Sequence, residues 1–183
     1  MKFSHLRLPI FALAALAALL PIQAHAQSAS ELSSRSRRAL NQLCAQNPAA
    51  AHLRKSAVGI LVFPDIKKAG FIVGAQHGEG ALLSGGNTVG YYRTSAASYG
   101  LQAGVQQFGY ALFFMNQGDL KYLRQSSGWE FGTGPSVVIV DQGMARSLTS
   151  TTLRKGVYAF TFNQGGLMAG MGLQGSKITR FNP

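Results

Sequence analysis

Short apolar runs and regularly placed glycines dominate the chain after residue 56. The run at 57–63, AVGILVF, is compact and is followed by Pro64-Asp65, so it predicts a buried strand that ends in a turn. The stretch 69–115 then alternates short apolar segments with glycine, and we expect several strands within it. Further extended segments are predicted at 128–132, 136–140, 157–162 and 167–180, with a turn or short helix at 141–150.

Four glycines, at positions 70, 74, 78 and 80, have even numbers and therefore share one face of an extended chain. Interior glycines weaken a strand unless a neighbour approaches the backbone closely or the sheet bends there. Residues 84–87, SGGN, carry a hairpin turn signal between two of the strands. These features predict a strongly curved antiparallel sheet with one face closely covered.

Helices are expected at 31–46, at 48–55 and at 116–125. The first has an apolar face, and Asn47-Pro48 separates it from the second. The predicted fold class is therefore α+β: a curved, glycine-rich, barrel-like antiparallel sheet covered by a few short helices. We expect an N-terminal helical segment at 27–56 and a β-rich core at 57–183, which together form one domain.

The polar side of the first helix carries Arg35, Arg37 and Arg38, and its apolar side carries Leu32, Ala39, Leu40 and Leu43. A basic amphipathic helix near an exported N-terminus can lie on an anionic membrane surface. Alternatively, the helix covers the sheet and its arginines face water. The sequence leaves both interpretations open.

Residues 1–26 have the pattern of a secretory signal peptide. Lys2 and Arg7 precede an uncharged, Leu/Ala-rich segment at 8–22, and Ala24-His25-Ala26 supplies a small-x-small cleavage site. The alternative is an uncleaved membrane anchor. We expect an exported protein, placed in the periplasm, peripheral to the membrane of the cell envelope, or secreted.

The chain contains 17 Lys and Arg residues against 6 Asp and Glu residues, a net charge of +11. Without Lys2 and Arg7 the balance is 15 to 6, or +9. This surplus favours anionic partners such as phospholipid headgroups or lipopolysaccharide, and export argues against nucleic acid. The single cysteine leaves no internal disulfide, so stability must come from packing.

Several fragments imitate chemical motifs without their context. Residues 170–175 match G-x-G-x-x-G, but neither a following helix nor an acidic residue is present downstream. His77 and Glu79 lack further metal ligands, and Cys44 is expected to be a buried free thiol. The six acidic residues are scattered singly, so no carboxylate pair is available for acid–base catalysis. We predict a protein that is not an enzyme, with no catalytic residue, metal site or cofactor.

Three segments read together resemble one known family. They are AVGILVFPDIKKAGFIVGAQHGEGALL at 57–83, GWEFGTGPSVVIV at 128–140 and YAFTFNQGGLMAGMGLQGSKITR at 158–180. Within them KAGF, the G-x-G of Gly78 and Gly80, and GLMAGMGLQGS are similar to the SYLF lipid-binding domain, a family that includes actin-binding members.

The resemblance implies phospholipid binding, with phosphoinositides as ligands of eukaryotic members. An exported bacterial protein would not meet actin in its own envelope, so we expect an anionic phospholipid membrane surface as the partner. The residues expected to bind the lipid are Arg35, Arg37, Arg38, Lys55, Lys67 and Lys68. In this hypothesis they attract headgroups while apolar side chains of the first helix insert shallowly. The alternative is a structural or interaction module of the envelope that binds a protein or polysaccharide.

Overall fold

The computed structural model describes residues 28–70, 73–99, 104–140, 156–165 and 175–183. The predicted signal peptide, the turn or helix at 141–150 and most of the strand at 167–180 lie outside these residues. The three helices of this part are α1 (Ala29–Gln46), α2 (Pro48–Arg54) and α3 (Gln117–Gln125). Its strands are β1 (Gly59–Gly70), β2 (Val73–Ser84), β3 (Asn87–Tyr99), β4 (Gly104–Phe114), β5 (Trp129–Glu130), β6 (Val137–Val140), β7 (Val157–Gly165) and β8 (Lys177–Phe181).

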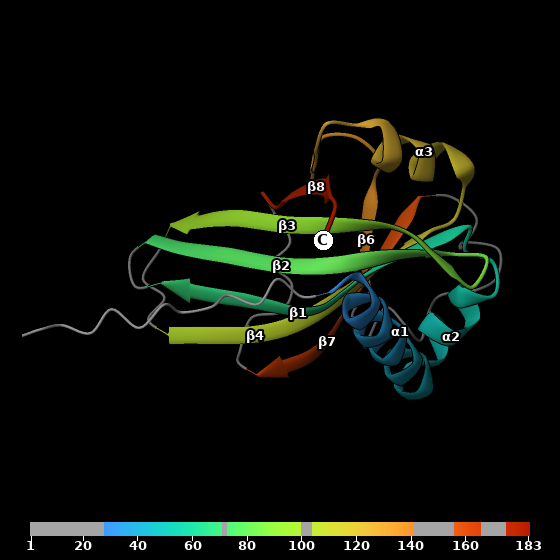
Figure 1. Ribbon diagram of the computed structural model, residues 1–183, viewed down its shortest axis with the longest axis horizontal. Helices are drawn as coiled ribbons and strands as arrows, with labels where there is room; N and C mark the ends of the chain where they lie inside the picture. Colours follow the sequence, from blue (N-terminus) through green and yellow to red (C-terminus); the bar gives the residue numbers. More distant parts are fainter. Residues whose placement is uncertain (1–27, 71–72, 100–103, 141–155, 166–174) are drawn as a thin grey trace, which may run out of the picture.

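The eight strands form one strongly curled sheet in the order β5-β8-β3-β2-β1-β4-β7-β6 (Figure 1). The predicted α+β class is confirmed. The sheet is mixed, however, because β6 pairs with β7 in parallel while the other pairs are antiparallel. Parallel neighbours need a crossover of about a dozen residues or more, and residues 141–156 supply that length.

Strand β1 continues past Pro64 instead of ending there. The pairing of β1 with β2 shifts between Val62 and Asp65, and its pairing with β4 shifts between Phe63 and Ile66. A proline has no N–H to donate, and a bulge is one of the places where a sheet tolerates it. The prediction that a turn follows Phe63 was therefore wrong, because a bulge accommodates Pro64.

The glycines of β2 lie where its neighbour β1 comes closest. A Cβ on Gly80 would collide with the carbonyl oxygen of Val62 and lie 2.8 Å from Cδ1 of Phe63. A Cβ on Gly78 would collide with Cδ1 of Ile66 and lie 2.9 Å from the carbonyl oxygen of Asp65. The predicted close approach to the glycine backbone is thus confirmed at Gly78 and Gly80. It occurs at the bulge of β1.

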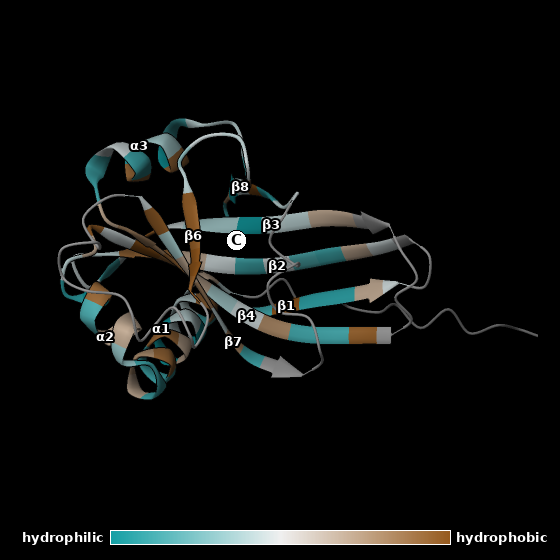
Figure 2. Cartoon of the chain, turned by 180° about the vertical axis from the view of Figure 1, so that it is seen from behind, coloured by the Kyte–Doolittle hydropathy of each residue, from teal (hydrophilic) through white to brown (hydrophobic). Residues whose placement is uncertain are grey.

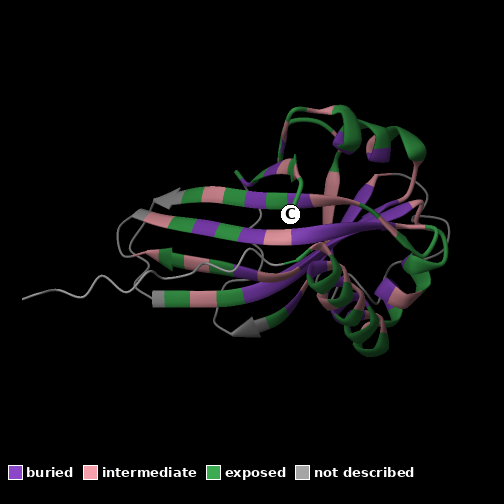
Figure 3. Cartoon of the chain, in the orientation of Figure 1, coloured by how far each residue is buried: buried purple, intermediate pink, exposed green. Residues whose placement is uncertain are grey.

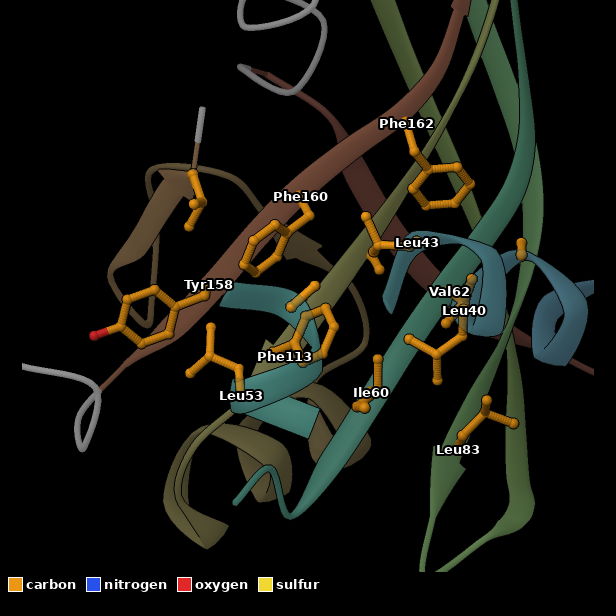
Figure 4. Packing of buried hydrophobic residues seen from close by; sticks show 14 of the residues in the cluster. Leu40, Leu43, Leu53, Ile60, Val62, Leu83, Phe113, Tyr158, Phe160 and Phe162 are labelled. Atoms are coloured by element: carbon orange, nitrogen blue, oxygen red, sulfur yellow. The ribbon is translucent and has the colours of Figure 1, made fainter. Parts of the chain in front are cut away.

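Side chains of the strands alternate between two apolar cores, one on each face of the sheet. Ile60 and Val62 of β1 pack with α1, α2 and β7, as Figure 4 shows. Leu61 and Phe63 point to the other face, where α3 and Trp129 lie. Figure 3 shows that residues of the sheet are buried where the helices cover it, and that exposed residues become frequent toward the far ends of β1–β4. The four central strands therefore project beyond their helical cover, and Figure 2 shows hydrophilic positions along the projecting parts.

Local signals explain the helix ends and the one tight hairpin. The Ser28 hydroxyl accepts a hydrogen bond from the Glu31 N–H at 3.2 Å and begins α1. The Asn47 side chain accepts bonds from the first N–H groups of α2, directly after α1 ends. Gly85 and Gly86 have φ values of 54° and 79°, which the primed hairpin turns require, so the turn predicted at 84–87 is confirmed.

We expect Gly80→Ala to lower the free energy of unfolding by about 1–3 kcal/mol, because the new Cβ would force β2 away from the β1 bulge. Urea denaturation measures the change. Gly118→Ala in α3 is a suitable control, since a Cβ there would meet only Asn116 Oδ1 at 3.2 Å. Because Gly118 lies in the first turn of α3 and its Cβ would press only on the capping side chain of Asn116, that replacement should change the free energy of unfolding by less than about 1 kcal/mol. A Gly80→Ala variant as stable as the parent would show that β1 and β2 are not in tight contact.

We also expect alkaline pH to destabilise the fold through Tyr110. Burial raises the pKa of Tyr110 well above its usual value of 10.0, and the hydrogen bond that its O–H donates to Thr94 Oγ1 at 3.0 Å offsets this only in part. Above about pH 10 the unfolded chain loses this proton while the folded chain keeps it, so stability falls as pH rises. The free energy of unfolding measured from pH 9 to 11 should therefore fall less steeply in Tyr110→Phe. An unchanged slope would contradict the assignment.

Candidate functional site

The apolar face of α1 is part of the core. Leu32, Leu40 and Leu43 are at most 4% exposed, and they pack against strands of the sheet or against α2. The expectation that this face inserts into a membrane is wrong for this fold, because the sheet already covers it. The alternative that the helix covers the sheet is the arrangement observed.

The three arginines of α1 have different environments. Arg35 forms an ion pair with Asp65 of β1 at 3.4 Å. Arg37 donates hydrogen bonds to the Gly86 carbonyl and, at 3.4 Å, to Thr88 Oγ1 in the β2–β3 hairpin. Arg38 is exposed on the outer side of the helix. Arg35 and Arg37 thus flank the buried face and hold the helix to the sheet from either side.

The three lysines named from the sequence do not share one surface either. Lys55 is exposed at the end of α2. Lys67 and Lys68 follow each other in β1, so their side chains point to opposite faces of the sheet. Lys67 is exposed and Lys68 is half-buried. Of the six predicted residues, the structure places Arg35, Arg37, Arg38 and Lys55 on or next to the two helices, and Lys67 and Lys68 on β1.

A cleft of about 280 Å³ lies between α1, α2 and the β2–β3 hairpin. We call it the arginine cleft, and its lining residues are Arg37, Leu40, Asn41, Arg54, Ala57, Ile60, Leu83, Ser84, Gly85 and Gly86. Leu40, Ile60 and Leu83 belong to the core beneath it and form an apolar floor. Arg37 of α1 and Arg54 of α2 add two positively charged guanidinium groups to the lining.

The charge of the arginine cleft is not balanced within the described part of the chain. Arg54 donates a hydrogen bond to Asn41 Oδ1 at 2.8 Å, and the acceptors of Arg37 are also neutral. By contrast, Arg35 pairs with Asp65, and Arg93 pairs with Glu79 at 2.9 Å. No Asp or Glu appears among the lining residues. The arginine cleft therefore carries two positive charges that no described carboxylate neutralises.

Arg54 is the member of the cleft that sequence reasoning missed. It directly precedes Lys55, which was predicted from the sequence as a lipid-binding residue. It is also the last residue of a seven-residue helix, whose apolar face is too short to predict how the helix is oriented. The apolar pattern of α1 predicts its buried face and places Arg37 on the polar side of the helix. It does not predict that α2 folds back so that Arg54 meets Asn41 of α1. That contact depends on the sharp break at Asn47.

His77 and Glu79 lie on the sheet face, as expected. His77 is exposed, and its Nε2 lies 4.0 Å from Glu79 Oε1, which also binds Arg93. Within the described residues there is no group of three or more His, Cys, Asp or Glu side chains placed to hold a metal ion. Cys44 is partly buried against the α1 side of the core, which is less than the full burial predicted for it.

One known protein family matches the C-terminal part of the chain. Residues 95–182 match the family model Ysc84, described as Las17-binding protein actin regulator. This is the SYLF family that the three sequence segments resemble. The matched range includes two of the three segments that carry the resemblance, whereas 57–83 precedes it. No curated protein matched the chain.

The SYLF family consists of lipid- and actin-binding domains and is not known for enzymes, which supports the role of a binding module. In the part of the chain that the structure describes, no helix has the length and apolar character needed to cross a bilayer.

We expect Arg54→Gln to slow alkylation of Cys44. Burial raises the pKa of this thiol, and a hydrogen bond and the positive charge of Arg54 oppose the rise. Without that guanidinium the pKa rises further, so less thiolate is present at pH 8. The chain has one cysteine, so the rate of reaction with iodoacetamide reports on this site alone. Lys121→Gln on α3 is the control, and an equal or faster rate in Arg54→Gln would contradict the assigned contact.

Proposed function

We propose that this SYLF domain binds anionic phospholipid surfaces through its two N-terminal helices. The observation that carries the proposal is the charge of this layer: residues 28–55 contain five Lys and Arg residues and one acidic residue. Arg38 and Lys55 are exposed, and Arg37 and Arg54 have only neutral partners. Such a concentration of cations attracts an anionic surface.

The proposed contact is electrostatic and does not depend on insertion. Because Leu32, Leu40 and Leu43 are buried in the fold, α1 has no apolar face to offer to a bilayer while the domain stays folded. Each basic residue near an anionic surface contributes about 1 kcal/mol, so a few together give weak, reversible binding. Salt should weaken this binding strongly, since exposed charges are screened within about 10 Å at 0.1 M ionic strength.

The proposed ligands are anionic phospholipids of the bacterial cell envelope. Phosphoinositides are the ligands that the family resemblance implies for eukaryotic members, and here the broader class of anionic phospholipids is proposed. The signal-peptide pattern at 1–26 supports a place in the bacterial cell envelope, periplasmic or peripheral to its membrane. In that compartment the available anionic surface is the membrane itself.

Vesicle flotation tests the proposal. We expect the mature protein to float with vesicles of phosphatidylglycerol and phosphatidylcholine and to stay unbound with phosphatidylcholine alone. Arg38→Gln combined with Lys55→Gln should reduce binding to the anionic vesicles by roughly thirtyfold, the equivalent of about 2 kcal/mol for two cations. Both positions are exposed and lie outside the arginine cleft, so the fold should be unaffected.

The matched control removes two charges from the opposite side of the sheet. Lys121→Gln combined with Arg124→Gln in α3 leaves the α1–α2 layer intact, because α3 packs on the other core. This variant should bind anionic vesicles nearly as well as the parent. Equal binding to neutral and anionic vesicles, or equal losses in both variants, would refute the proposal.

A second candidate function is protein binding, favoured by the description of the matched family as an actin regulator that binds Las17. In this reading the same basic helices contact an acidic protein, or a polysaccharide, of the envelope. Crosslinking in cells separates the two candidates. A dominant stoichiometric protein partner with no lipid recovered would favour the second, and recovery of lipid without such a partner would favour the first.

A further inference from the structure

We propose that the arginine cleft is a specific site for a phosphate monoester group. The arginines of the fold differ in whether a carboxylate balances their charge. Arg35 and Arg93 are each paired with a carboxylate, whereas Arg37 and Arg54 share a cleft with no carboxylate among the described residues. This inference rests on the proposed function only for the source of the phosphate, which is either a lipid headgroup or a free phosphate.

The two positive charges of the arginine cleft favour a phosphate monoester over a phosphodiester. A phosphate monoester carries about −1.5 to −2 at pH 7, so one such group balances two guanidinium groups. A phosphodiester, the group in phosphatidylglycerol, carries a single negative charge and would leave one guanidinium unbalanced. The cleft should therefore prefer a monoester, such as the headgroup of phosphatidic acid, over a diester at the same total surface charge.

Arg37 and Arg54 keep enough free N–H donors to bind a phosphate group. A guanidinium has five N–H donors in a planar fork that matches phosphate oxygens. Arg37 uses donors on the Gly86 carbonyl and on Thr88, and Arg54 uses donors on Asn41 and on the Cys44 thiol. These neutral contacts hold both forks in place and leave further N–H groups free. The arginines are thus positioned before the ligand arrives, which lowers the entropic cost of binding.

The size and floor of the cleft fit a small anionic headgroup. Its volume of about 280 Å³ is below the usual range for drug-sized ligands, about 300–1,000 Å³, so it can admit a phosphate with a short glycerol segment but not two acyl chains. Leu40, Ile60 and Leu83 exclude water from below.

The first arm of the test uses inorganic phosphate as the probe. Sodium phosphate is titrated into the isotope-labelled mature protein, with sodium chloride at equal ionic strength as the reference, and amide NMR shifts are followed. We expect saturable shifts at Arg54 and at 84–86, the residues that line the cleft. Arg54→Gln should weaken this binding by about tenfold or more, since a charged hydrogen bond is lost.

The second arm uses vesicles of matched surface charge, one set with phosphatidic acid and one with phosphatidylglycerol. We expect the parent protein to prefer phosphatidic acid by about tenfold, and Arg37→Gln combined with Arg54→Gln to abolish the preference. Arg54→Gln alone serves as a second variant if loss of the Arg37 contacts destabilises the fold, because Arg54 is exposed and its described partners, Asn41 and the Cys44 thiol, both lie on α1. The Lys121→Gln and Arg124→Gln variant should retain the preference.

The outcomes separate this inference from the proposed function. Vesicle binding without any preference for the monoester, and phosphate shifts that are absent or unchanged by Arg54→Gln, would overturn the site and leave the lipid-surface proposal standing. Saturable phosphate binding in the cleft without vesicle binding would support the site, assign its ligand to free phosphate and contradict the lipid surface.

Discussion

The bulge in β1 is the constraint on which the rest of the structure depends. It interrupts the pairing of β1 on both sides between Val62 and Ile66, at the position of Pro64. The Val62 carbonyl then lies so close to β2 that only glycine fits at position 80, and the same carbonyl accepts a buried hydrogen bond from Ser36 of α1 at 3.3 Å. Three elements therefore meet at one backbone oxygen, and a bulge is a known way to bend a strand and increase its twist.

The position of α1 follows from that meeting point. Ser36 is fully buried against β1, and Arg35, one residue earlier, reaches Asp65 just beyond the bulge. With the helix fixed in rotation, the next residue, Arg37, must lie on the other flank, where it contacts the β2–β3 hairpin. The arginine cleft is thus a consequence of how the helix is seated on the sheet. Its cations are held by the fold and are not free to spread over the surface.

Local patterns predicted most of the elements, because caps, turns and alternation act over a few residues. The apolar face of α1, the Gly85-Gly86 hairpin and the close approach at Gly78 and Gly80 all follow from such rules. What the sequence could not provide depends on contacts between distant segments. The continuation of β1 past Pro64 needs a partner on each side, and the parallel pairing of β6 needs a crossover. The basic residues were grouped by sequence distance, whereas the fold points Lys67 and Lys68 to opposite faces of the sheet and brings Arg54 to the same cleft as Arg37.

The pairing of charges distinguishes arginines that stabilise the fold from arginines that are available to a ligand. An ion pair with a carboxylate satisfies the charge of Arg35, so a competing anion would have to displace Asp65 to bind there. The neutral acceptors of Arg37 and Arg54 orient these groups but leave their charge uncompensated. Both groups line the same cleft, so one anion bound there can accept charged hydrogen bonds from each of them. The affinity for such an anion should therefore exceed what either arginine would provide alone.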